Sequence, residues 1–107
     1  MYTYNATLVR VVDGDTVYFT VDLGFCITTK LDFRLAKINA PEMKTPEGPK
    51  AKAELERLLG LGAITIQSLK LDKYGRWIAQ IFVKEGDKTI DVNQTLLDGG
   101  FAIPYKS

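Results

Sequence analysis

The alternation of apolar and polar positions along this chain predicts β-strands over its first third. Residues 6–12 form a β-branched run that stops at Asp13-Gly14, and residues 15–21 form a second run. Asp-Gly between two such runs is a strong hairpin signal, because both residues tolerate the positive φ of a tight turn. Residues 25–38 form a third extended run, long enough to bend near 28–30. We therefore expect a meander of three strands.

A helical pattern follows, and then further strands. Residues 50–59 consist of good helix formers, with Ala51, Leu55, Leu58 and Leu59 on one face and glycines just after the end. Residues 63–69 and 77–83 have the composition of strands. Residues 91–97 predict a short helix with Asp91 as its N-cap and glycines at its end.

Three strands, a helix, two strands and a short helix is the element order of an OB-type barrel. We expect a mainly β (α+β) protein. Its fold would be a five-stranded OB-fold Greek-key barrel with one helix between strands 3 and 4 and a short C-terminal helix. At 107 residues, the chain is expected to form a single domain over residues 1–107.

The amino-acid composition excludes several kinds of chemistry but says little about the fold. The chain has 46% hydrophobic and 25% charged residues and a net charge of +1, which argues neither for nor against a nucleic-acid partner. Cys26 is the single cysteine and histidine is absent, so an intramolecular disulfide, a Cys/His zinc site and a histidine base are excluded. No run approaches the about 18 apolar residues of a membrane span, so we expect no membrane association. The sequence as given predicts a cytoplasmic protein. Secretion is the alternative if a leader peptide has been removed from this sequence.

The stretch from Phe33 to Glu42 contains the most unusual charged residue. Arg34 shares its strand face with Ala36 and Ile38. A guanidinium held there needs a carboxylate or a phosphate, because burying an unpaired charge is very costly. A structural salt bridge or a solvent-facing arginine would explain Arg34 equally well. Pro41 should end the strand and leave Glu42 at its mouth.

Several polar residues near strand ends suggest phosphate chemistry. Asp15 opens the second strand and Asn39 closes the third, so their oxygens could converge on a hard cation, although turn chemistry also explains Asp15. Guanidiniums such as those of Arg34 and Arg76 stabilise the charge that phosphodiester hydrolysis develops. In a chain without histidine, Glu42 is the natural candidate for the general base.

Short motifs in a fixed order strengthen this interpretation. They are Val12-Asp13-Gly14-Asp15-Thr16-Val17, Phe33-Arg34-Leu35 through Ala40-Pro41-Glu42, Gly48-Pro49-Lys50-Ala51, Asp72-Lys73-Tyr74-Gly75-Arg76 and Val92-Asn93-Gln94-Thr95-Leu96-Leu97. Together they resemble the staphylococcal nuclease (thermonuclease-like) family over nearly the whole chain. The resemblance implies a calcium-dependent endonuclease that cleaves DNA and RNA with little sequence specificity and leaves 3′-phosphate ends.

The resemblance also implies roles for single residues. Arg34 and Arg76 would clamp the phosphate, Glu42 would orient the attacking water, and Asp15 would bind calcium. Asn39 stands where the staphylococcal enzyme has a second calcium-binding aspartate, and the next ligand would be the backbone carbonyl of Ala40. Because Asn39 keeps an oxygen but loses a charge, we expect one weakly bound Ca²⁺.

Substrate contacts are expected from three further residues. Lys73 and Tyr74 match positions that contact the terminal phosphate and pack beside the nucleotide, and Tyr105 is a candidate for stacking on a base. The partner would be nucleic acid, with single-stranded DNA or RNA favoured, and the protein would be a monomer. The rival interpretation is a catalytically weak or inactive OB-fold module that binds nucleic acid or peptide.

Overall fold

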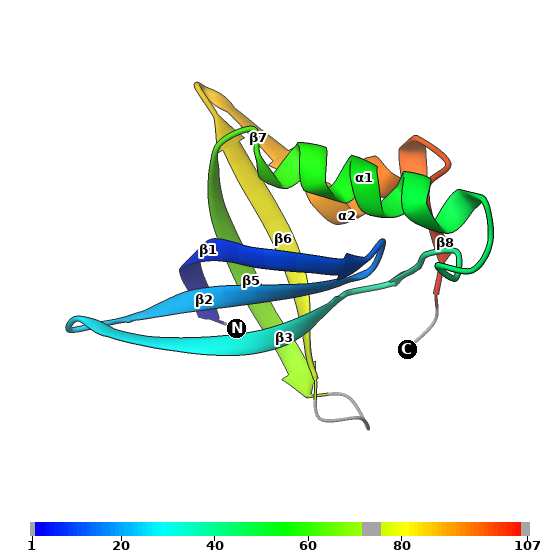
Figure 1. Cartoon of the computed structure of the whole chain (residues 1–107). Helices are drawn as coiled ribbons and strands as arrows, with labels where there is room; N and C mark the ends of the chain where they lie inside the picture. The colour runs from blue at the N-terminus through cyan, green and yellow to red at the C-terminus, as the bar shows by residue number, and fades with distance from the viewer. Residues whose placement is uncertain (1, 72–75, 106–107) are drawn as a thin grey trace.

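The structure is a computed structural model that describes residues 2–71 and 76–105. Its elements, in chain order, are β1 (Tyr2–Asp13), β2 (Thr16–Gly24), β3 (Ile27–Leu35), β4 (Ile38–Asn39), α1 (Glu47–Leu59), β5 (Ala63–Leu71), β6 (Trp77–Glu85), β7 (Lys88–Asp91), α2 (Val92–Asp98) and β8 (Ile103–Pro104) (Figure 1). Neither helix is long and apolar enough to cross a membrane, within the part of the chain that the structure describes.

Five of these strands close into a barrel. Strands β3, β2, β1, β5 and β6 are antiparallel neighbours in that order, and β6 returns to pair in parallel with β3. The parallel pairing joins Phe33 to Trp77 and Leu35 to Ala79. Strand β7 extends the sheet from β6, and β4 pairs separately with β8. The prediction of a mainly β, OB-type barrel with a helix between its third and fourth strands is confirmed.

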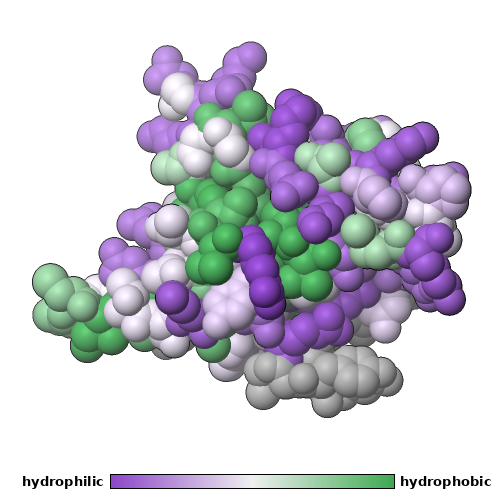
Figure 2. Space-filling view, in the orientation of Figure 1, coloured by the Kyte–Doolittle hydropathy of each residue, from purple (hydrophilic) through white to green (hydrophobic). Residues whose placement is uncertain are grey.

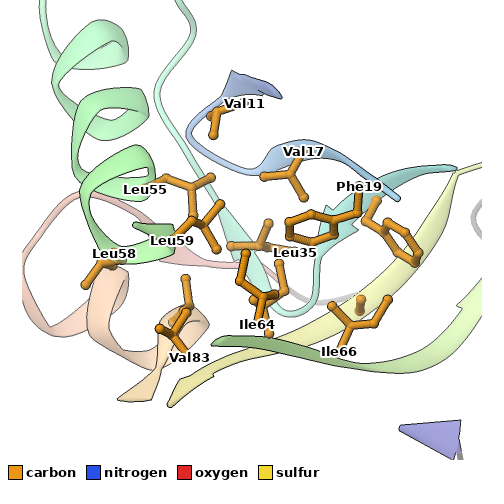
Figure 3. Close-up of a cluster of buried hydrophobic side chains, with 14 of the residues drawn as sticks. Val11, Val17, Phe19, Leu35, Leu55, Leu58, Leu59, Ile64, Ile66 and Val83 are labelled. Atoms are coloured by element: carbon orange, nitrogen blue, oxygen red, sulfur yellow. The ribbon is translucent and has the colours of Figure 1, made fainter. Parts of the chain in front are cut away.

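The helices cover one end of the barrel, where α1 packs against β1 and α2 (Figure 1). The predicted apolar face of α1 is buried. Figure 3 shows Leu55 and Leu59 of α1 pointing towards side chains from the barrel strands, such as Val17 and Ile64, and Leu58 belongs to the same buried cluster. This single core therefore ties α1 to the strands that bring the candidate site residues together.

The expected third strand begins at Ile27 instead of residue 25 and is interrupted once, so this part of the prediction is wrong. Phe25 and Cys26 form the turn between β2 and β3, with φ of 54° and 63°. A second turn at Ala36-Lys37 separates β3 from β4, with Lys37 at φ 64°. The register with β2 is regular at 28–30, so no bulge marks the bend expected there. Composition failed here because bulky residues seldom adopt positive φ, so Phe25, Cys26 and Lys37 were not expected in turns.

The β2–β3 turn leaves apolar side chains in solvent. Phe25 is 98% exposed, and Leu23 and Ile27 are about half exposed. Figure 2 shows this apolar surface at the end of the hairpin. The hairpin end lies at the opposite end of β2 and β3 from Asp15 and Arg34, so it is separate from the candidate site.

Candidate active site

Asp15 lies in the turn between β1 and β2 and its side chain is buried, with 9% of the residue exposed. The turn comprises Gly14 and Asp15, one residue later than expected from the sequence. A Cβ on Gly14 would lie 2.7 Å from the Cβ atoms of both Ala40 and Ala51. The turn can therefore pack against α1 and the end of β4 only because residue 14 has no side chain.

The Asp15 carboxylate is held by three groups. The Ala40 N–H donates to Oδ2 at 2.9 Å, and the Thr16 hydroxyl donates to Oδ1 at 3.1 Å. A guanidinium nitrogen of Arg34, Nη2, lies 3.8 Å from Oδ2. Burial raises the pKa of Asp15, and the neighbouring Asp13 adds to this, while the Ala40 N–H and Arg34 act against it. A cation bound at this carboxylate would offset the burial and lower the pKa again.

Arg34 is largely buried, with 15% of its side chain exposed, so the solvent-facing interpretation is wrong. Its Nη1 donates to the Ile38 carbonyl at 3.0 Å and its Nη2 donates to Asn39 Oδ1 at 3.3 Å. The Tyr105 ring covers the guanidinium, with 4.8 Å between Cζ and the ring centroid. Arg34 is therefore fixed from three sides beside Asp15, a geometry that suits either a structural ion pair or a phosphate clamp.

Thr16 connects the second arginine to the same cluster. Arg76 Nη1 donates to the Thr16 hydroxyl at 3.3 Å, and that hydroxyl donates in turn to Asp15. Thr16 is only 6% exposed. The sequence marked Thr16 as a polar residue at a strand end but assigned it no role, because a threonine is also an ordinary strand former. Both guanidiniums thus lie at the same end of the barrel as Asp15.

Glu42 is placed differently from the other predicted residues. Its side chain is 71% exposed, and its Oε2 lies 3.2 Å from Lys44 Nζ, which is itself 83% exposed. The sequence predicted a carboxylate beside two arginines, and the structure pairs it with a lysine two residues later. Glu42 still lines a cavity of about 260 Å³ together with Asn39, so it borders the cluster.

The remaining predicted residues fall into two groups. Asn39 and Tyr105 both contact Arg34. Ala40 is linked to the cluster by its N–H, which donates to Asp15, and the role of its carbonyl as a calcium ligand stays a prediction. Lys73 and Tyr74 lie outside the described residues, which are 2–71 and 76–105.

Asp15 and Asn39 supply oxygen donors of the kind that hard cations prefer. Asp15 Oδ2 and Asn39 Oδ1 lie 3.8 and 3.3 Å from Arg34 Nη2, so both oxygens face that guanidinium nitrogen. Among the described residues, no three His, Cys, Asp or Glu side chains form a group that could hold a metal. One carboxylate and one amide suit a cation such as Ca²⁺ that completes its shell with water and substrate oxygens.

Asn93, at the start of α2, fixes the turn that precedes Asn39. It is 3% exposed, its Nδ2 donates to the carbonyls of Ala36 and Ala79 at 3.0 and 3.2 Å, and its Oδ1 accepts from the Ile81 N–H at 3.1 Å. Asn93 therefore ties the start of α2 to the turn at Ala36-Lys37. Its contacts join α2 and β6 to the residues that lead into β4.

Comparisons with known proteins point to one family. A family model described as "Staphylococcal nuclease homologue" matches residues 32–107. An "Uncharacterized endonuclease" of Escherichia coli O157:H7 is 30% identical over 99 residues, which is 92% of this chain and 60% of that protein. An uncharacterized protein of Methanocaldococcus jannaschii is 30% identical over 130 residues, covering 97% of this chain and 60% of its own length. A "Micrococcal nuclease" of Shigella flexneri is 26% identical over 108 residues, covering 96% and 59%. This chain spans about three fifths of the length of these relatives.

Proposed function

Because this chain belongs to the family of staphylococcal nuclease homologues, we propose that it is an endonuclease that hydrolyses phosphodiester bonds of DNA and RNA with little sequence specificity. We propose further that the reaction depends on calcium and leaves 3′-phosphate ends. The observation that best supports this proposal is that both arginines are linked to the buried carboxylate of Asp15. Arg34 contacts it directly, and Arg76 is linked to it through the Thr16 hydroxyl. Two arginines held at one place by fixed partners suit a phosphate, because their forked N–H groups match its oxygens.

The two arginines would act on the phosphate in the transition state. Negative charge grows on the phosphoryl oxygens as water attacks, so guanidiniums fixed beforehand stabilise that state more than the ground state. Arg34 needs little rearrangement, since the Ile38 carbonyl and Asn39 already orient it. Thr16 would act as a positioning residue for Arg76.

Asp15 and Asn39 are the residues that would hold a calcium ion. When bound, the ion would neutralise a phosphate oxygen and help to place the attacking water. The burial of Asp15, which raises its pKa, supports this assignment, because a buried carboxylate is stabilised by a neighbouring cation. The loss of one charge at Asn39 predicts weak binding.

Glu42 would take the proton from the attacking water. To do so, its carboxylate must leave Lys44, with which it is paired at 3.2 Å. Both side chains are mostly exposed, and exposed ion pairs contribute only about 0–1 kcal/mol, so this rotation costs little. Tyr105, beside Arg34, would stack on a base of a single-stranded substrate, and Lys73 and Tyr74 would add contacts from outside the described residues.

A second candidate function is a binding module that has lost catalysis. It is favoured by the Glu42–Lys44 pair, since a module that only binds nucleic acid or peptide needs no carboxylate near the arginines. The two candidates predict the same phosphate contacts and differ only in turnover.

The test is cleavage of fluorescent single-stranded DNA and RNA with calcium and with a chelator. We expect cleavage only with calcium, and products that a polymerase extends only after phosphatase treatment has removed their 3′-phosphates. Arg76→Ala should lower kcat strongly, while Arg57→Ala, an exposed arginine on α1 that pairs with Glu54, should leave it unchanged. Tight binding without any cleavage would favour the binding module, and cleavage that persists in chelator would refute the role of the metal.

A further inference from the structure

The cavity beside the arginine cluster has walls from two distant segments. One wall comprises the end of β4 with Pro41 and Glu42, and the other comprises residues 100–103, which follow α2 and end at the first residue of β8. Its volume of about 260 Å³ is close to the lower end of known ligand pockets, roughly 300 Å³. The cavity is thus large enough for a small planar group.

The position of the cavity relates it to the phosphate cluster. Ile103 is the strand partner of Asn39, and Asn39 accepts a hydrogen bond from Arg34. Tyr105 comes two residues after Ile103, so the two side chains share one face of this extended segment. Tyr105 covers Arg34, and its N–H donates to the Lys37 carbonyl. The segment therefore presents the aromatic ring of Tyr105 over the arginine and the aliphatic side chain of Ile103 beside the cavity.

The chemistry of the walls suits the face of an aromatic ring. Pro41, Phe101 and Ile103 supply apolar surface, with Ile103 64% exposed and Phe101 half-buried. Asn39 and Glu42 supply polar groups at the side nearest the arginines. An apolar hollow with a few polar groups at one edge is the usual form of a ligand site. Proteins that bind single-stranded nucleic acid hold its bases mainly by stacking.

Each phosphodiester in a nucleic acid strand links two nucleosides. At the arginine cluster, Tyr105 could stack on the base of only one of them. We propose that the cavity lined by Pro41, Phe101 and Ile103 is a second base subsite, which receives the base on the other side of the scissile phosphate. This inference rests on the proposed function. The subsite should tolerate all four bases, because its surface is apolar and stacking carries little sequence information.

The experiment uses Ile103→Ser, which alters an exposed side chain, with Ile103→Val as the conservative variant. Ile27→Ser is the matched control, since Ile27 is 56% exposed at the far hairpin end. Each protein is titrated by fluorescence anisotropy with short single-stranded DNA, either intact or with one abasic position moved along the strand. Cleavage of the same strands is followed in parallel, with calcium present.

Loss of one base-stacking surface should weaken binding of intact DNA by Ile103→Ser about 10-fold. Ile103→Val and Ile27→Ser should bind like the original protein, and one abasic position next to the cleaved bond should abolish the Ile103→Ser effect. An equal effect of Ile103→Ser on intact and abasic strands, or an effect matched by Ile27→Ser, would overturn the subsite. If no protein cleaves but the binding pattern holds, the subsite stands and the proposed nuclease activity fails.

Discussion

Replacing Asn93 by alanine should destabilise the whole fold, because this one side chain satisfies buried backbone groups on two segments. Truncation leaves the Ala36 carbonyl and the Ile81 N–H without the partner that Asn93 gives them, and both residues are at most 1% exposed. The Ala79 carbonyl loses less, since it also accepts the Ala36 N–H at 2.8 Å.

The expected size follows from this count. Each buried polar group that loses its partner costs roughly 1–3 kcal/mol, so two groups give a loss of about 2–6 kcal/mol in the free energy of unfolding. For a small domain with a urea m-value of about 2 kcal/mol/M, the midpoint should fall by roughly 1–3 M. Binding of calcium and DNA should weaken as well, since the turn at Ala36-Lys37 leads directly to Asn39.

Urea unfolding followed by the fluorescence of Trp77 measures this change. The control is Gln94→Ala, one position later on the exposed face of α2, which should shift stability by no more than about 0.5 kcal/mol. If Asn93→Ala unfolds at the same urea concentration as Gln94→Ala with an unchanged m-value, the three hydrogen bonds do not stabilise the site as argued.

Three further changes probe the cluster itself. Thr16→Val should lower kcat about 10- to 100-fold by removing the hydroxyl between Asp15 and Arg76, while Thr16→Ser should retain most activity, as steady-state kinetics would show. Asn39→Asp should tighten calcium binding in calorimetry, and an unchanged affinity would place Asn39 outside the ligand shell. Because the pKa of Asp15 is raised in the folded chain, its ionisation costs stability as pH rises through that pKa. Without metal, Asp15→Asn should therefore have a higher melting temperature than the original protein at neutral pH, and this difference should disappear in acid. Added calcium should not raise the melting temperature of the variant. A lower melting temperature of the variant at neutral pH would contradict the burial argument.

The parts of this molecule that follow from local patterns could be predicted from the sequence. The buried face of α1 and the cap of α2 by Asp91 are of this kind, since helix periodicity and capping depend on residues a few positions apart. The turn at Ala36-Lys37 and the exact position of the turn at Phe25-Cys26 could not be predicted, because both turns place positive φ on residues that seldom adopt it.

The candidate site shows the same division. Arg34 and Asp15 stood out because a charge among apolar neighbours and an aspartate at the start of a strand are visible in the chain. The bridge through Thr16 was not visible, because it depends on how β2 meets the residue before β6. The pairing of Glu42 with Lys44 was also missed, since it is set by side-chain conformation on an exposed loop.

The contact of Gly14 with Ala40 and Ala51 separates what this scaffold can vary from what it cannot. The connection from Glu42 to the start of α1 runs over the surface, so insertions there can lengthen it and reshape the rim without disturbing the barrel. The three small residues behind it have no such latitude, since a single added methyl group at position 14 would wedge the hairpin away from the helix. We therefore expect changes in substrate range to arise from sequence changes in the loop. We expect no larger residue at positions 14, 40 and 51, where the turn, the strand end and the helix meet.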